Sequence, residues 1–161
     1  MKTRLTWKKG VFSNLYKIYD NGNLIGNLKD SSFSQSAKGS IRGRGYFFRT
    51  HGFFNPVTDI VDSTTNKTVG KIQYNSWRSK ATITLNGETI NWKYDNVWNT
   101  QWSLSDSDGT AMKFNSSTTR GQIDVRLDND LLVLTGLFVQ NYYIQMAFVV
   151  IFIAVIIPVL T

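Results

Sequence analysis

The sequence predicts an all-β domain that closes into an antiparallel barrel of about twelve strands around one C-terminal apolar helix. Through most of the chain, short segments of alternating apolar and polar residues are separated by turn residues at intervals of roughly 8 to 12 positions. Residues 141–160 form instead a largely apolar run without a charged side chain. The 161 residues suffice for one domain with a sizeable core, so residues 1–161 are taken as a single unit.

The clearest hairpin is centred on Asn86-Gly87, a dipeptide typical of two-residue type I′ turns. Pairing across this turn keeps apolar residues on one face of both strands and polar residues on the other, which specifies the register. A turn at Ser76-Trp77 would add a preceding strand with Ile72 on the inner face. The predicted partners across Asn86-Gly87 are Ile83 and Ile90, Ala81 and Trp92, Thr84 and Thr89, Thr82 and Asn91, and Lys80 and Lys93.

Two further hairpins follow the same logic. The segment Asp20-Asn21-Gly22-Asn23 joins residues 15–19 to residues 24–28 and sets Ile18 opposite Ile25. A loop at residues 107–109, with glycine in the left-handed region, sets Leu104 opposite Met112 and Trp102 opposite Phe114. Consecutive strands are therefore expected to pair as an antiparallel meander.

The C-terminal part of the chain has a different pattern. Residues 131–139 are apolar at nearly every position and predict a strand buried on both faces. Residues 141–160 are too many for one strand and predict a helix of about 30 Å. Because this helix has no polar face, it lies either in a membrane or surrounded by protein.

Both interpretations of residues 141–160 remain open. A C-terminal transmembrane anchor fits their length and apolarity, since the hydrocarbon core of a bilayer is about 30 Å thick. A central helix fits equally, because a barrel of about twelve strands leaves room for one helix of about 10 Å diameter. The near absence of a linker before the helix favours the central position. Val150, in the middle of the run, is then expected to be fully buried.

Composition excludes several kinds of site. The chain has no cysteine and one histidine, His51, which rules out disulfides, thiolate sites and sites with two imidazoles. Paired carboxylates, a nucleophile elbow, a phosphate loop and a metal-binding cluster are not recognisable in the sequence. We therefore expect no catalytic residue, no metal and no cofactor, and predict that the protein is not an enzyme.

Four basic residues form the candidate binding site. Lys80 and Lys93 face each other on the outer surface, Lys71 lies diagonal to Lys80 in the predicted register, and Arg78 points the same way. Like charges directly opposed on a sheet are destabilising, and a bound anion would relieve their repulsion. The site is expected to hold phosphate or anionic lipid, the alternative being a solvated surface whose lysines serve solubility.

The order of elements, about twelve strands followed by one apolar helix, resembles the tubby C-terminal domain and the related LURP-one and phospholipid scramblase families. Strand–turn–strand units similar to theirs occur at residues 18–22, 60–62 and 102–109, and the resemblance covers essentially the whole chain. It implies a barrel around a central helix and binding of phosphoinositide headgroups through basic surface residues. Unlike the scramblases, this chain has no cysteine for palmitoylation. No ligand-binding residue of these families maps onto a particular position here.

The net charge of +7 favours acidic partners. We therefore expect a non-enzymatic, tubby-like domain in the cytoplasm that binds anionic phospholipid, phosphoinositide among them, at the membrane surface. The alternatives are a scaffolding domain that acts through protein contacts and a β-domain held by a C-terminal membrane anchor. Nucleic acid is not expected as a partner, because the basic and aromatic segment 42–49 lacks the helices of an RNA-recognition module.

Overall fold

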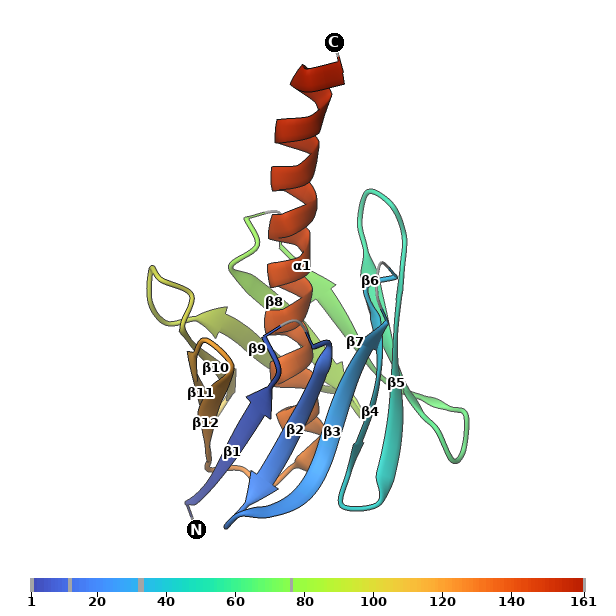
Figure 1. Cartoon of the computed structure of the whole chain (residues 1–161). Coiled ribbons are helices and arrows are strands. Elements are labelled where there is room, and N and C mark those ends of the chain that lie inside the picture. The colour runs from blue at the N-terminus through green and yellow to red at the C-terminus, as the bar shows by residue number, and fades with distance from the viewer. Residues whose placement is uncertain (1, 12, 32–33, 76, 161) are drawn as a thin grey trace.

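The computed structural model is a closed barrel of twelve antiparallel strands with one long helix, and it describes residues 2–11, 13–31, 34–75 and 77–160. Each strand pairs with the next along the chain, and the last pairs with the first (Figure 1). The predicted fold class is confirmed. The strands are β1 (Thr3–Lys9), β2 (Leu15–Asp20), β3 (Asn23–Ser31), β4 (Ser36–Ile41), β5 (Arg44–His51), β6 (Val57–Asp62), β7 (Thr68–Tyr74), β8 (Lys80–Leu85), β9 (Glu88–Tyr94), β10 (Gln101–Asp106), β11 (Gly109–Ser117) and β12 (Arg120–Val125).

The helix α1 (Asp130–Leu160) enters the barrel at one end, fills it and projects from the other end (Figure 1). It includes residues 131–139, so the prediction of a strand there was wrong. A run that is apolar on all sides has neither the two-residue period of a strand nor the 3.6-residue period of an amphipathic helix. The sequence therefore did not distinguish a strand buried on both faces from a helix buried all round.

The barrel surrounds only the first part of α1. Its strands of six to nine residues, tilted by about 40°, give a wall roughly 20 Å high, which matches about 13 helical residues. Residues 131–143 are buried accordingly, whereas residues 147–160 are exposed on all sides. Val150 is 42% exposed, so the prediction that it is fully buried was wrong. The apolar helix is central, as expected, but its core segment lies before most of the predicted range 141–160.

Polar contacts fix the beginning of α1 at the barrel wall. The Oδ1 atom of Asn129 accepts a hydrogen bond from the backbone N–H of Leu131 at 3.1 Å, as a helix N-cap does. Arg42, in the turn between β4 and β5, pairs with Asp130 in the first helical turn and with Asp20, at 3.0 Å, on β2. These contacts hold the start of the helix in place at one end of the barrel.

Aromatic side chains of the wall hold the buried part of α1. The backbone carbonyl of Gly136 accepts hydrogen bonds from the indole Nε1 atoms of Trp92, at 3.2 Å, and Trp102, at 3.1 Å. Phe48 stacks on Phe138 with ring centroids 4.7 Å apart. The buried carbonyl is thus satisfied twice, and the helix is fixed in depth and rotation.

The predicted hairpins are largely confirmed. All five residue pairs across Asn86-Gly87 are observed, and φ is 49° at Asn86 and 85° at Gly87, as a type I′ turn requires. Leu104 and Met112 pair as predicted, as do Trp102 and Phe114. The prediction for Ile18 was wrong: it pairs with Gly26, because the register shifts by one residue at this point in the β2–β3 ladder.

The two ends of the barrel differ. Because the strands alternate in direction, the connections that follow β1, β3, β5, β7, β9 and β11 lie together where α1 leaves the barrel, which we call the exit end (Figure 1). The other connections and Asp130 lie at the opposite end, which we call the start end. Tight polar turns such as Asn21-Gly22 and Asn86-Gly87 make up the start end.

Candidate functional site at the exit end of the barrel

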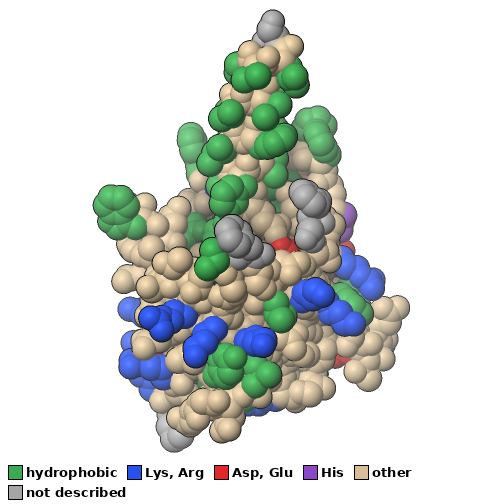
Figure 2. All heavy atoms as spheres, in the orientation of Figure 1, with side chains coloured by type: hydrophobic (Ala, Val, Ile, Leu, Met, Phe, Trp, Pro, Cys, Tyr) green, Lys and Arg blue, Asp and Glu red, His purple; other side chains and the backbone are tan. Residues whose placement is uncertain are grey.

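Exposed apolar side chains concentrate at the exit end. Of the exposed large hydrophobic residues that the structure describes, only Leu24 and Leu127 lie elsewhere. Figure 2 shows such side chains all along the projecting helix and on loops around its base, above a barrel wall that carries Lys and Arg. Outside the helix, the exposed large hydrophobic residues described at this end are Val11, Phe53, Phe54, Trp77, Val97 and Trp98.

Two of the exit-end loops have the same construction. The pattern Asn-x-Trp-x-Ser/Thr occurs in residues 75–79 and again in residues 96–100. In each loop the asparagine Oδ1 accepts two backbone hydrogen bonds at 3.0–3.1 Å, from the residues four and five positions later. The residue after the tryptophan has φ of 55° in both loops. The shared geometry leaves Trp77 86% exposed and Trp98 81% exposed.

The helix itself fastens the first of these loops. The hydroxyl of Tyr143 donates to the backbone carbonyl of Lys80, and it also lies 3.3 Å from Asn75 Oδ1. Tyr74 pairs with Ala81, so the predicted register with a two-residue turn at Ser76-Trp77 was wrong; Ser76 itself lies outside the described residues. Sequence reasoning missed both tryptophan loops, although the repeated pattern could have revealed them.

Acidic side chains gather at the start end. Eight of the eleven acidic residues lie there, in turns or within two residues of a strand or helix end. By contrast, many basic residues lie in the exit-end loops or within the last three residues of a strand at that end. The acidic residues are Asp20, Asp62, Glu88, Asp106, Asp108, Asp124, Asp128 and Asp130, and the basic ones are Lys8, Lys9, Lys17, Lys29, Lys38, Arg49, Arg78, Lys80, Lys93 and Arg120. The start end also carries basic residues, several of which pair with these acids, whereas positive charge is in clear excess at the exit end. The basic residues of the start end are Lys2, Arg4, Arg42, Arg44, Lys67 and Arg126.

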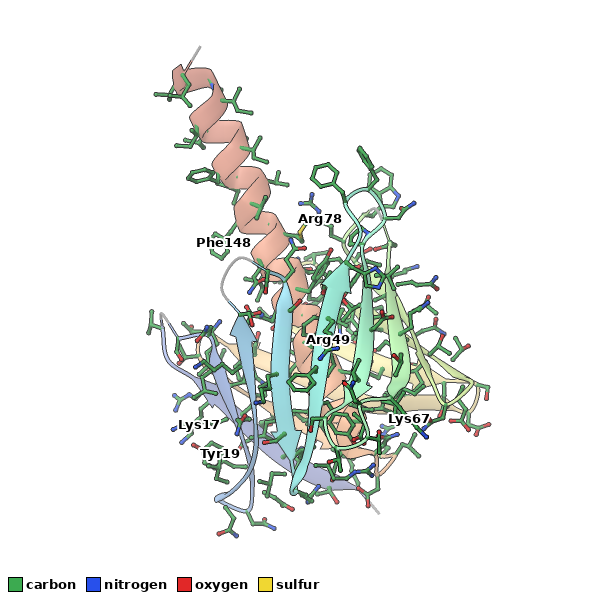
Figure 3. The ribbon with its side chains drawn as sticks, turned by 90° about the vertical axis from the view of Figure 1, so that its right-hand side faces the viewer. Lys17, Tyr19, Arg49, Lys67, Arg78 and Phe148 are labelled. Carbon is green, nitrogen blue, oxygen red and sulfur yellow. The ribbon has the colours of Figure 1, made fainter. Side chains whose placement is uncertain are left out.

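The structure brings three of the four predicted site residues to the exit end. Lys80 and Lys93 are paired on the outer wall, as predicted, where β8 begins and β9 ends. Lys71 is not beside them: it pairs with Thr84, four residues along β8 from Lys80, because the loop is longer than the predicted turn. Arg78 lies in that loop next to the helix and does not point along the outer wall (Figure 3).

Opposed lysines are not confined to the predicted site. Lys8 pairs with Lys17 between β1 and β2, and Lys29 pairs with Lys38 between β3 and β4. The basic surface of the barrel therefore extends around the wall well beyond the predicted group. The connections between β1 and β2 and between β3 and β4 have no specific turn signature, so these two registers were not predicted.

A buried polar cluster surrounds the helix where it leaves the barrel. The Nδ2 atom of Asn141 donates to Asp30 Oδ2 at 3.0 Å, and its Oδ1 atom accepts from the Tyr16 hydroxyl at 3.1 Å. Burial raises the pKa of Asp30, opposed by the hydrogen bonds from Asn141 and the Ser31 amide and by the charge of Lys9. Burial likewise lowers the pKa of Lys9, opposed by Asp30.

The raised pKa of Asp30 predicts a specific pH dependence of stability. The folded state holds the proton of Asp30 more tightly than the unfolded state, so its contribution to folding is largest below about pH 4 and falls as pH rises through the folded pKa. Asp30→Asn removes this dependence. We expect the variant to gain stability relative to the parent between about pH 4 and neutrality, measured by unfolding in detergent micelles. A stability difference that does not change with pH would contradict this assignment.

We next consider side chains that could bind a metal ion or transfer a proton. Within the ranges that the structure describes, no group of three His, Asp or Glu side chains could hold a metal ion. His51 Nε2 lies 2.8 Å from Asp59 Oδ2 on the outer wall, with both side chains in contact with solvent. The features that stand out at the exit end are apolar, aromatic and basic.

Comparisons with known proteins add little to these observations. No family model matches the chain, and no curated protein matches it. An X-ray structure of a protein from Arabidopsis thaliana is 13% identical to it and matches with a TM-score of 0.34 over 86% of this chain and 88% of that chain. The fold assignment therefore rests on the strand pairing of this chain.

Proposed function

We propose that the protein is a non-enzymatic barrel domain anchored in a membrane by the projecting part of α1, with its exit end facing the bilayer. The observation that carries this proposal is the exposure of residues 147–160, a continuous apolar helix without a charged side chain. Fourteen such residues in water would be very unfavourable, since each buried apolar side chain is worth about 1.5–3 kcal/mol. Lipid removes all of that surface from water at once.

A bilayer fits this helix better than a protein groove does. A helix that binds in a groove keeps a polar face toward solvent, whereas residues 147–160 have none. Within the described residues, α1 is long and apolar enough to cross a membrane. The stretch outside the barrel, residues 144–160, measures about 25 Å, close to the shortest helix that spans a hydrocarbon core of about 30 Å.

The loops around the helix suit the headgroup region. Tryptophan is enriched at membrane–water interfaces, where its ring is in apolar surroundings and its N–H remains hydrated. Trp77 and Trp98 are held outward at the level where α1 leaves the barrel, and Phe53 and Phe54 extend from a third loop at the same end. These four rings would enter the interface together with the helix.

The charge distribution agrees with the same orientation. Basic residues near a membrane surface that carries anionic lipid are each worth about 1 kcal/mol. The basic residues beside the exit end, including Lys80, Lys93 and Arg78, would lie close to the headgroups, and the start end, where most of the acidic residues lie, would face away. This placement supports anionic phospholipid as the partner and the cytoplasmic face of a membrane as the location.

The proposal also includes membership of the tubby-like superfamily. The barrel of twelve strands around a helix supports it, together with the strand–turn–strand units at residues 18–22, 60–62 and 102–109. Binding of phosphoinositide by the basic wall would follow from that membership. Among the described side chains there is no metal-binding cluster, and the His51–Asp59 pair is open to solvent on the outer wall; both observations are compatible with a binding role.

Flotation with vesicles tests the anchor. The full chain is expected to float with phosphatidylcholine vesicles and to stay bound in high salt, because lipid burial of an apolar helix does not depend on charge screening. A chain ending at Ala147 keeps all of the buried helix, residues 131–143, and should be a soluble, folded domain that no longer floats. Circular dichroism of the shortened chain checks the fold.

Two outcomes would contradict the anchor. The first is recovery of the full chain as a defined soluble oligomer and not with vesicles, which would assign residues 147–160 to a protein interface and favour the scaffolding role. Alternatively, the shortened chain floats as well as the full one, so another surface binds the membrane. Replacing Lys80 and Lys93 by Gln, with vesicles that contain phosphatidylserine, separates the contribution of the basic wall.

A further inference from the structure

A pocket of about 480 Å³ opens at the exit end between α1 and the barrel wall. It is lined by the two tryptophan loops, by α1, by the adjoining strands of the wall and by the β11–β12 turn. The lining includes Lys9, Arg78, Tyr94, Trp98, Gln140 and Ile144. In the orientation proposed above, the mouth of the pocket lies in the headgroup layer.

Two cations line this pocket: Arg78, and Lys9, whose charge also interacts with the buried Asp30. Among the described residues, neither Lys9 nor Arg78 forms an ion pair. Lys9 is partly buried, with its Nζ atom 5.2 Å from the centre of the Tyr16 ring. Arg78 is half-buried in the first tryptophan loop, next to α1. Both positive charges remain available to an anion.

Two buried polar atoms in the lining also lack a partner. Gln140 is 5% exposed and its Oε1 atom accepts no hydrogen bond from a described residue. Trp7 is 2% exposed and its Nε1 atom donates none. A buried polar group left unpaired costs about 1–3 kcal/mol, so such groups call for an explanation. The Trp7 Nε1 atom lies against the backbone of Gly121 on β12, so the vacant acceptor of Gln140 is the group that indicates a polar ligand in this cationic pocket.

We propose that this pocket binds the headgroup of one anionic phospholipid that carries hydroxyl groups, such as phosphatidylglycerol. The proposal rests on the membrane orientation described under the proposed function. Phosphate oxygens accept from Lys9 and Arg78, and a headgroup hydroxyl donates to Gln140 Oε1. A choline headgroup has no hydrogen-bond donor and would leave Gln140 unpaired.

Other lining residues would contact the glycerol backbone and the acyl chains of the lipid. Trp98 and Tyr94 are aromatic surfaces on the side of the pocket formed by β9 and the loop that follows it. Ile144 and Ala147 lie on α1 where it leaves the barrel, so the acyl chains would continue along the apolar helix into the bilayer. The site thus lies between helix and wall, distinct from the outer surface that carries Lys80 and Lys93.

Native mass spectrometry of the full chain, released from detergent micelles, tests the pocket. With added phosphatidylglycerol we expect one lipid to be retained saturably, and with phosphatidylcholine no such species. Lys9→Gln with Arg78→Asn should weaken retention about tenfold or more, since it removes two cations near an anionic headgroup. Arg78→Asn alone leaves Lys9 and the buried Asp30 unchanged and should weaken retention about threefold or more, with asparagine tolerating the positive φ.

The charge-matched control is Lys80→Gln with Lys93→Gln on the outer wall, which should retain phosphatidylglycerol within about twofold of the parent. If both double variants weaken retention of phosphatidylglycerol equally, binding depends on diffuse positive charge and the pocket proposal is wrong. Retention of phosphatidylcholine to the same extent as phosphatidylglycerol would also contradict the proposal. Free glycerol phosphate should compete only weakly, and displacement of the lipid by it at equal concentration would assign the site to a soluble phosphate ester. Flotation of the full chain with phosphatidylcholine vesicles tests the membrane anchor alone. A chain that floats but does not retain phosphatidylglycerol would contradict the pocket and leave the anchor supported.

Discussion

Leu137→Asp is expected to unfold the barrel. Leu137 lies in the middle of the buried part of α1 and has no exposed surface. An aspartate there would lack both water and a partner, because the side chains around it are those of the apolar core. An unpaired buried charge costs several kcal/mol, a large share of the 5–15 kcal/mol that stabilise an ordinary domain. Loss of the near-ultraviolet circular dichroism signal in detergent micelles would report the unfolding.

Val150→Asp is the matched control on the same helix. Because Val150 is exposed outside the barrel, the substitution should leave the stability of the barrel within about 0.5 kcal/mol of the parent. It should instead weaken membrane insertion, since an aspartate near the centre of a spanning helix costs roughly 3 kcal/mol. Comparable unfolding by both variants would mean that residues 147–160 pack against protein. If neither variant changes stability or membrane insertion, the helix is not divided into a buried part and a membrane part.

The two parts of α1 explain why the sequence supported both interpretations of residues 141–160. A barrel core and a bilayer select the same side chains, so an all-apolar helix does not reveal where one environment ends and the other begins. The boundary is marked instead by polar residues, among them Asn141, which bonds to Asp30 and Tyr16 of the wall. In the sequence, this asparagine is merely a polar residue at the start of an apolar run.

Strand pairing was predictable wherever the turn was short and specific. Asn86-Gly87 admits essentially one turn geometry, and the alternation on both sides of it then fixed every pair correctly. The loop at 75–79 has no such signature, and its extra residues moved Lys71 away from Lys80. The candidate site was therefore predicted at the right end of β8 and β9 but with one wrong member, and with Arg78 on the wrong surface.

What the sequence could not supply is the convergence of distant residues at one end. The tryptophan loops, Lys9 on β1 and Gln140 on α1 meet only because the barrel closes and the helix passes through it. Local periodicity does not reveal closure, and the meander alone would equally allow an open sheet. The repeated Asn-x-Trp-x-Ser/Thr pattern was the one local clue to the exit end.

Gly136→Leu should be strongly destabilising, even though leucine favours a helix by about 1 kcal/mol relative to glycine. A Cβ atom at Gly136 would lie 2.3 Å from Cζ and 2.7 Å from Cε2 of the Phe114 ring. That ring cannot move easily, because it stacks on Trp102, whose indole donates to the Gly136 carbonyl. We expect a loss of about 3 kcal/mol or more, since overpacking by a single small group already costs about 1–3 kcal/mol.

A compensating change distinguishes this steric cause from a defect of the helix backbone. Phe114→Ala alone removes a buried ring and should cost about 3–5 kcal/mol. In the double variant, the leucine at 136 can occupy the space that the ring leaves, so the combined loss should be smaller than the sum of the single losses by about 1–3 kcal/mol. Denaturant unfolding of the four chains measures this coupling. Simple additivity would show that Gly136 is required for its backbone and not for the room it leaves to Phe114.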